Sequence, residues 1–334
     1  MPKVTDFYKF LAATHILGLS LLLSPSQVIP VAQTVYSPAY SHERACFAVK
    51  YKDEVSAYRV NGVFVLPDEI LVIQVVSPDS GTQYTFEAPS GAVTEDKGKK
   101  WLWKISPDPG LYVGKIVASP QKDTVTLNVF VMLPFARLKG EYLDSYRIGR
   151  YPKVPYEGLP SYRPPRGFIQ VTRENELTHV GPHFTLKQFV GKQQPHTYPK
   201  YIVLRERLVL KLEHILERVN ERGYRASTFA ILSGYRTPFY NRAIGNVKYS
   251  RHVFGGAADI FIDEDPKDEM MDDLNKDGRI DYRDSAVIYD IIDEMYGKPW
   301  YEPFVGGLAR YRKTRSHGPF VHVDVRGFRA RWGD

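Results

Sequence analysis

The sequence predicts an all-β, immunoglobulin-like sandwich followed by an α+β domain. Three observations carry this prediction. Residues 45–136 hold repeated short β-branched and aromatic runs, separated by turn motifs such as SPDSG and SPDPG. Residues 137–168 are rich in Pro, Tyr and Arg, which is typical of an extended connector. Residues 169–334 combine an amphipathic helix with short apolar strands, and 334 residues suffice for two cores.

Composition limits the classes of function. Hydrophobic residues make up 43% of the chain and charged residues 25%, as in ordinary globular proteins. The net charge of +7 suits an anionic polymer partner and equally a merely soluble surface. No stripe of Arg and Lys with interleaved aromatic residues is present, so we expect no nucleic-acid partner. Cys46 is the single cysteine, which excludes an intrachain disulfide, and we expect it to be a small buried hydrophobe.

The N-terminus reads as a targeting segment. Lys3 and Lys9 precede or flank a short apolar run, Phe10–Leu23, that has the length of a signal-peptide core. No clean small-x-small cleavage motif follows, and 32–37 is the best region. Residues 1–37 are therefore a signal peptide or, as the alternative, an uncleaved membrane anchor. Either way we expect an exported protein of the periplasm or cell envelope, of undetermined oligomeric state.

The runs in 45–136 predict strands over 57–66, 69–76, 82–88, 100–106, 111–118 and 124–133. This region contains no histidine, and its carboxylates lie mostly in turns, which favours a structural domain over a binding or spacer module. The tyrosines and arginines of the connector, 137–168, either pack against both domains or contact a glycan. The sequence leaves that choice open.

An amphipathic helix opens the second domain. Its apolar face is predicted from Leu204, Leu208, Leu212, Ile215 and Val219, and Gly223 ends it. His214 stands among charged residues in this helix, so we expect it to be solvated. A strand ending at Leu232 follows, and then a loop that carries Ser233, Arg236 and Asn241.

Two histidines and an aspartate have the spacing of a metal site. In the stretch SRHVFGGAADIFID, strand alternation places Asp259 on one face, and His252 lies just upstream of two glycines. In HGPFVHVDVRG, His322 and Asp324 share one face. His252, Asp259 and His322 would form a three-ligand zinc site with an open fourth position, the catalytic arrangement. The alternative is that these residues are hydrogen-bonded members of the core or surface.

Three motifs in order, SGYRTPFYN, SRHVFGGAAD and FVHVDVRG, make residues 167–334 resemble the zinc D-Ala-D-Ala carboxypeptidases, peptidase family M15. The family's His-x-x-Gly-x-Ala-x-Asp motif is matched by His252, Gly255, Ala257 and Asp259. Its later metal histidine corresponds to His322, and its substrate-contacting arginine to Arg236. The resemblance implies an α+β zinc peptidase domain at 169–334.

The resemblance also implies a mechanism. Zinc held by His252, Asp259 and His322 would activate a water molecule near neutral pH. His317 would then be a catalytic residue that exchanges protons rather than a ligand, and Arg236 would act in catalysis and substrate binding. Ser250 and Asp324 stand where they would orient the ligands or meet substrate, with a substrate amine as an alternative partner for Asp324.

The implied function is cleavage of peptidoglycan stem peptides next to a D-amino acid. Two alternatives stay open: an endopeptidase of the same family, and a non-catalytic cell-wall-binding module. The latter would need a broken ligand set, and here every ligand position is filled.

A calcium site is predicted in the segment DLNKDGRIDYRD, 273–284, which fits a twelve-position EF-hand loop. Gly278 makes the sharp turn at position six and Ile280 is the apolar plug. The ligands would come from Asp273, Asn275, Asp277, Arg279 (through its carbonyl), Asp281 and Asp284. Position twelve is Asp rather than the usual, longer Glu. We expect a structural calcium ion and a following helix, starting near Ser285, that buries Ile288, Ile291, Ile292 and Met295. The alternative is a solvated acidic loop.

Overall fold

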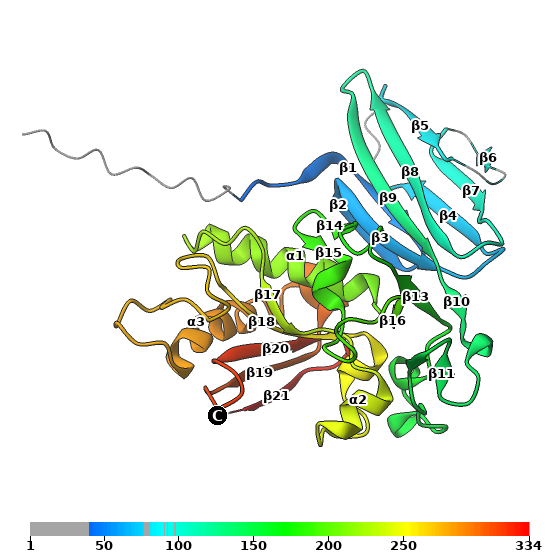
Figure 1. The fold of residues 1–334 in the computed structure, drawn as a ribbon. Helices are drawn as coiled ribbons and strands as arrows, with labels where there is room; N and C mark the ends of the chain where they lie inside the picture. Colours follow the sequence, from blue (N-terminus) through cyan, green and yellow to red (C-terminus); the bar gives the residue numbers. More distant parts are fainter. Residues whose placement is uncertain (1–39, 77–80, 90, 92, 97, 334) are drawn as a thin grey trace, which may run out of the picture. The chain divides into compact units, whose positions relative to one another are not determined.

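The computed structural model describes residues 40–76, 81–89, 91, 93–96 and 98–333 (Figure 1). The predicted signal peptide or anchor, 1–37, lies outside the described residues. Within the part of the chain that is described, none of the helices has the length and apolar character that a membrane crossing requires.

Two sheets form the N-terminal region, with strand orders β2-β1-β4-β7-β6 and β3-β9-β8-β5 (Figure 1). Pairing is antiparallel except between β3 and β9, which are parallel. The bounds are β1 Arg44–Tyr51, β2 Glu54–Tyr58, β3 Val60–Val65, β4 Ile70–Val75, β5 Gln83–Glu87, β6 Val93–Asp96, β7 Lys100–Lys104, β8 Gly110–Ser119 and β9 Asp123–Val131.

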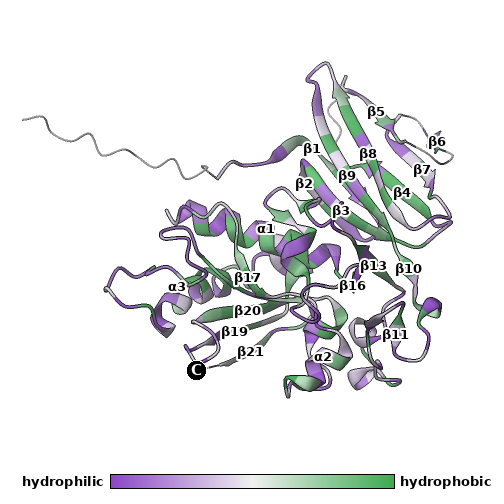
Figure 2. Ribbon diagram, viewed as in Figure 1, coloured by the Kyte–Doolittle hydropathy of each residue, from purple (hydrophilic) through white to green (hydrophobic). Residues whose placement is uncertain are grey.

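Alternation along these strands explains the packing of the two sheets. In β4, Leu71, Ile73 and Val75 are buried while the residues between them are exposed. In the neighbouring β7, Trp101 and Trp103 are buried and Leu102 between them is exposed. Hydrophobic and hydrophilic segments also alternate along β8 and β9 (Figure 2). Buried side chains of both sheets join one hydrophobic cluster. The immunoglobulin-like assignment of this region stays a prediction.

The structure differs from the predicted strands at two points. The run predicted as one strand over 57–66 is divided at Arg59, because β2 belongs to one sheet and β3 to the other. Cys46 was expected to be buried and is exposed. It occupies an outward position of β1, where the alternating residues Phe47 and Val49 point into the core.

The connector contains short strands and single turns rather than one extended segment. Its strands are β11 Tyr142–Leu143 and β12 Tyr146–Arg147, and β10 Leu133–Pro134 lies just before it. Several of its tyrosines are buried, and Tyr151 shares a hydrogen bond with Tyr235 of the C-terminal region, 2.8 Å between the two hydroxyls. Packing against the C-terminal region is therefore one role of these tyrosines.

The C-terminal region is organised around the sheet β17-β18-β20-β19-β21 (Figure 1). Helix α3 contacts β19 and β20 of this sheet, and α1 contacts α3. The bounds are β13 Gly167–Val171, β14 His179–Gly181, β15 Phe184–Thr185, β16 Lys200–Ile202, α1 Glu206–Glu221, β17 Ala230–Ser233, α2 Pro238–Ala243, β18 Ala257–Phe261, α3 Tyr282–Asp293, β19 Gly307–Tyr311, β20 Phe320–Asp324 and β21 Ala330–Gly333.

Helix α1 is buried on more than its apolar face. It contacts β2 and β3 of the N-terminal region as well as α3. Lys211, Glu213 and Glu217 are consequently buried along with the predicted leucines. The expectation that His214 is solvated is wrong: its side chain is 18% exposed and its ring lies 4.9 Å from that of Phe304.

Candidate metal centre

Three side chains predicted as zinc ligands converge in the C-terminal sheet. His252 lies in a 3-10 turn, Arg251–Phe254, that leads into β18. Asp259 of β18 is directly opposite His322 of β20 in an antiparallel pair. Opposite residues of such a pair point to the same face of the sheet. The sheet register therefore brings the aspartate and the second histidine together, and the turn before β18 adds the first.

The hydrogen bonds of the two histidines fix which ring nitrogens face the centre. Nδ1 of His252 donates to the carbonyl of Gly234 over 2.7 Å, and Nε2 of His322 donates to Asp324 Oδ2 over 3.3 Å. The other two ring nitrogens then carry lone pairs. They lie 3.2 Å apart, and Asp259 Oδ1 lies 2.8 Å from Nδ1 of His322 and 3.2 Å from Nε2 of His252.

This donor set fits a zinc ion. The exposed fractions of His252, Asp259 and His322 are 2%, 3% and 6%. Three lone pairs that face one another in a dry site repel unless a cation or a proton lies among them. Two imidazole nitrogens and a carboxylate oxygen are ligands that zinc prefers. Among the described residues, no other group of three or more His, Cys, Asp or Glu side chains has this closeness.

The electrostatics of the centre favour an ionised carboxylate. Burial alone would raise the pKa of Asp259, but His252 and His322 hold that pKa far below its usual range. Burial lowers the pKa of His252. For His322, burial acts in the same direction, but the carboxylates of Asp259 and Asp324 raise its pKa on balance. The centre therefore offers a cation the negative charge of Asp259 and the neutral imidazole nitrogen of His252, while the raised pKa of His322 means that a cation competes with a proton there.

Arg236 lies directly behind Asp259. Its Nη2 donates to Asp259 Oδ2 over 2.6 Å, and its Nε donates to Ser233 Oγ over 2.8 Å. Because Asp259 Oδ1 faces the histidines, the arginine holds the opposite oxygen of the same carboxylate. Arg236 also lines the cleft described below. Its contact with substrate stays a prediction.

Asp324 is placed to orient His322 rather than to meet substrate. It is 0% exposed and does not line the cleft. Besides His322, its carboxylate accepts hydrogen bonds from the backbone N–H of Gly307 over 2.8 Å and from Nε of Arg326 over 2.9 Å. A substrate amine would find no exposed surface of Asp324. Of the two roles considered for this residue, the geometry supports the orienting one.

A cleft of about 1110 Å³ opens onto the centre. His252, Asp259 and His322 all line it, and so does Ser250, which is 9% exposed. Tyr311 and Trp332 form part of its wall and are joined by a hydrogen bond of 2.7 Å from the indole Nε1. Further lining residues are Lys192, Ile231, Leu232, Tyr249, Arg326 and Phe328.

His317 lines the cleft but stands outside the group of three. Its Nδ1 is 2.8 Å from the carbonyl of Gly318, and its ring lies edge-on to Phe320 with 5.0 Å between centroids. The metal-binding group found among the described residues does not include it. This placement is compatible with a proton-transfer role, which stays a prediction.

Sequence reasoning missed two contributions to the site. First, the cleft is lined in part by the connector residues Tyr156, Glu157 and Tyr162. The high density of tyrosines in 137–168 could have indicated this role of the connector. Lys211 of α1 donates to the backbone carbonyl of Asp324 over 2.7 Å. No sequence signal marks Lys211, since a lysine on a helix is usually solvated.

The predicted calcium loop has local order of its own. Asp273 accepts hydrogen bonds from the backbone N–H of Gly278 over 2.7 Å and of Asp277 over 3.1 Å. Asp281 caps helix α3, which begins at Tyr282, three residues before the predicted start. Asp284 accepts from the N–H of Asp281 over 2.8 Å. Within the described residues these carboxylates do not form a gathered group like that of the zinc centre, and calcium binding stays a prediction.

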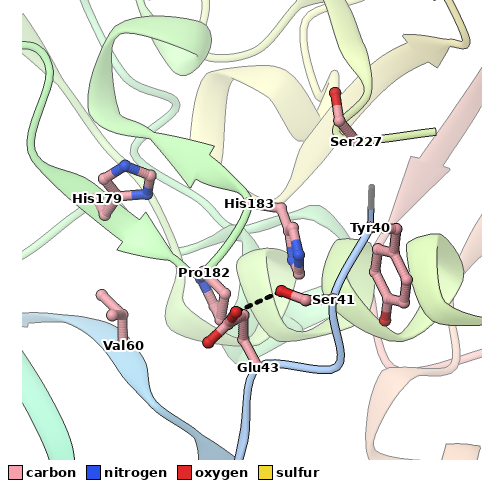
Figure 3. A pocket seen from close by; sticks show the side chains of 8 residues that line it. All are labelled: Tyr40, Ser41, Glu43, Val60, His179, Pro182, His183 and Ser227. Atoms are coloured by element: carbon pink, nitrogen blue, oxygen red, sulfur yellow. Dashed lines mark hydrogen bonds between the residues drawn. The ribbon is translucent and has the colours of Figure 1, made fainter. Parts of the chain in front are cut away.

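A second pocket has a volume of about 410 Å³, and Figure 3 shows the residues that line it. It shares no lining residue with the cleft. His183 stacks on Tyr40 there, with 4.9 Å between ring centroids, and its Nδ1 lies 2.7 Å from Glu213 Oε2. Ser41 and Glu43 are joined by a hydrogen bond at its edge (Figure 3). These contacts tie the start of the described chain to α1.

Comparison with known families finds a match that covers part of the centre. Residues 183–283 match the model of the family described as Peptidase M15. No curated protein matches the chain. The matched segment contains His252 and Asp259 and ends before His317 and His322. Peptidases of this family depend on zinc, and the chain presents a buried His-Asp-His group. The match thus supports an M15 metallopeptidase.

Proposed function

We propose that the protein is a zinc peptidase that cleaves peptidoglycan stem peptides next to a D-amino acid, as D,D-carboxypeptidases do. The observation that carries the proposal is the convergence of His252, Asp259 and His322 at the floor of a large cleft. Two of these residues lie inside the M15 segment. A non-catalytic wall-binding module would have no need of a complete, buried ligand set.

The fold and location belong to the same proposal. The C-terminal region, 169–334, is an α+β zinc peptidase domain, and 45–136 is an all-β sandwich that supports it. The protein is exported and works in the periplasm or at the cell envelope, where its substrate is found. Support for export comes from the charge order and the length of the apolar run at 10–23.

The residues of the chain have separable tasks in this reaction. When bound, zinc supplies Lewis-acid activation of water and of the scissile carbonyl. His252, Asp259 and His322 hold the ion, while Gly234 O and Asp324 keep the ring nitrogens of the two histidines in the required tautomers.

His317 and Arg236 are proposed to act on the substrate side. His317 lines the cleft and accepts or returns a proton at its free Nε2. Arg236 keeps Asp259 ionised and oriented, and offers its remaining N–H groups to a substrate carboxylate or carbonyl.

A second candidate, endopeptidase action, is favoured by the size of the cleft. Its volume of about 1110 Å³ exceeds that of ordinary small-ligand pockets, which hold roughly 300–1,000 Å³. A terminal dipeptide alone would leave most of it unfilled. A cross-linked or glycan-bearing stem peptide would occupy more of the wall.

A structural calcium ion in 273–284 is the remaining part of the proposal. The spacing of Asp273, Asn275, Asp277 and Asp284 and the positive φ of Gly278, +79°, support it. The loop joins β18, which carries Asp259, to α3, which packs on β20. An ion there would brace the wall of the metal centre without entering the chemistry.

Digestion of purified muropeptides tests the function. The zinc-loaded protein is incubated with defined monomeric and cross-linked muropeptides, and the products are weighed by mass spectrometry. Loss of a terminal D-amino acid indicates carboxypeptidase action, and separation of cross-linked peptides indicates endopeptidase action. Neither product from the wild type, or the same products from His252→Ala, would contradict the proposal.

A further inference from the structure

The cleft has an exposed apolar rim that the metal chemistry does not use. Tyr156 is 40% exposed, Ile244 46%, Val247 71% and Phe328 38%, and all four line the cleft. Grouped exposure of large apolar side chains on a concave surface marks a binding site. We propose that this rim is a saccharide subsite, which holds a sugar ring of the glycan attached to the stem peptide. The inference rests on the function proposed above.

The rim is held in place by a cluster of tyrosine rings. Tyr156 of the connector lies 5.4 Å from Tyr249 and 5.3 Å from Tyr162 between ring centroids. The hydroxyl of Tyr249 donates to the carbonyl of Val154 over 3.1 Å, and Nη1 of Arg251 donates to that of Ser161 over 2.6 Å. These contacts fasten residues 154–162 to the segment that carries His252. The connector is therefore a fixed wall of the cleft.

The rim is continuous with the metal centre. Tyr249 directly precedes Ser250, which also lines the cleft. On the other side, the guanidinium of Arg326 lies 5.6 Å from the ring centroid of Phe328 and 4.8 Å from that of Trp332. The ring of Trp332 is in turn 5.2 Å from that of His322. A substrate whose peptide lies at the centre can extend along this wall without leaving the cleft.

The chemistry of the rim favours a neutral, hydroxyl-bearing ring. A pyranose has a face of C–H groups, which packs on an aromatic ring, and an edge of hydroxyl groups, which bond to carboxylates and amides. Tyr156 offers such a ring. Glu157, the next residue in sequence, and Asn246, which also lines the cleft, offer a carboxylate and an amide. Glu157 and Lys248 carry opposite charges, and Asp324 neutralises Arg326. An acyl chain would not match this polar edge as well.

The test compares one stem peptide with and without its disaccharide. Both substrates are offered to the zinc-loaded wild type, to Tyr156→Ala and to Tyr142→Ala. Tyr142 is a matched control, because it also belongs to the connector, is 43% exposed and does not line the cleft. We expect the wild type and Tyr142→Ala to show kcat/KM about tenfold higher for the glycosylated peptide, a difference of about 1.4 kcal/mol. Tyr156→Ala should lose this preference mainly through KM.

The outcomes separate the subsite from the proposed function. Equal kcat/KM of the wild type for both substrates, or an equal loss for both in Tyr156→Ala, overturns the subsite and leaves the peptidase intact. If neither substrate is cleaved, the proposed function fails. The disaccharide alone is then tested by saturation-transfer NMR. Contact with the wild type that Tyr156→Ala loses and Tyr142→Ala keeps supports the subsite, and no contact overturns it.

Discussion

Lys211 of helix α1 reaches the backbone carbonyl of Asp324 on the C-terminal sheet, with 2.7 Å between Nζ and the oxygen. The lysine is 1% exposed. Burial lowers the pKa of Lys211 from its ordinary 10.5 to about 7, although the nearby Asp324 carboxylate opposes the shift. Asp324, two residues after the predicted ligand His322, is thus held by an amine whose pKa is near neutral.

The first prediction follows from this amine. Between pH 7 and 10.5 the unfolded chain binds more protons at Lys211 than the folded protein does, so this group makes stability rise with pH across that window. Below pH 7 its contribution is constant. Denaturant unfolding at several pH values should show that the free energy of unfolding rises less with pH for Lys211→Met than for the wild type. The exposed Lys153→Met serves as control, and a Lys211→Met profile parallel to the wild type would contradict the shift.

Metal retention is the second prediction. We expect about one zinc ion per chain in purified wild type, bound at roughly 2.0–2.2 Å by His252, Asp259 and His322. His252→Ala should lose both the metal and the activity, because it removes one of three ligands. His196→Ala, at an exposed histidine, should retain both. Elemental analysis and the muropeptide assay measure this, and a wild type without zinc would remove the basis of the function.

The third prediction separates His317 from the ligands. His317→Ala should retain zinc and lose roughly 10²–10⁴-fold in turnover, the usual contribution of a positioned acid or base. The same preparations serve for metal content and kinetics. Loss of zinc in this variant would make His317 a ligand instead.

Arg236 provides the fourth prediction. If it receives the terminal carboxylate of the substrate, amidation of that carboxylate should cost about 2–5 kcal/mol of transition-state binding, as for other buried charge pairs that lose one partner. Comparison of kcat/KM for free-acid and amidated peptides measures this. Equal rates would point to endopeptidase action, in which the chain continues beyond the scissile bond.

The fifth prediction concerns calcium. Binding at 273–284 in the folded state alone should add about 2.7 kcal/mol of stability at a hundredfold excess over the Kd. Calcium should therefore raise the Tm and the peptidase rate of the wild type. For Asp277→Ala, neither the addition nor the chelation of calcium should change the Tm or the rate. A wild type indifferent to a calcium-selective chelator in both assays would leave this loop as solvated acidic surface.

Local patterns suggested the members of the centre, but their grouping was predicted from the resemblance to the family's motifs, because the pairing of β18 with β20 is long-range. Alternation along two strands placed Asp259 and His322 on defined faces, and the glycines after His252 indicated the turn. The burial of Lys211 and the half-burial of His214 were not accessible in this way. They arise because α1 is covered by β2 and β3, from a region distant in sequence. The place of Tyr156 in the cleft depends likewise on contacts with Tyr249 that no local pattern encodes.

Strands β2 and β3 of the N-terminal region pack on α1, which has a consequence for the cooperativity of unfolding. Tyr58 and Phe64 from β2 and β3 belong to the same buried cluster as the leucines of the helix. At its edge, Arg44 pairs with the buried Glu217. Separation of the two regions would expose this cluster and leave that carboxylate without its partner. We therefore expect helix α1 to unfold together with β2 and β3, the strands that cover it.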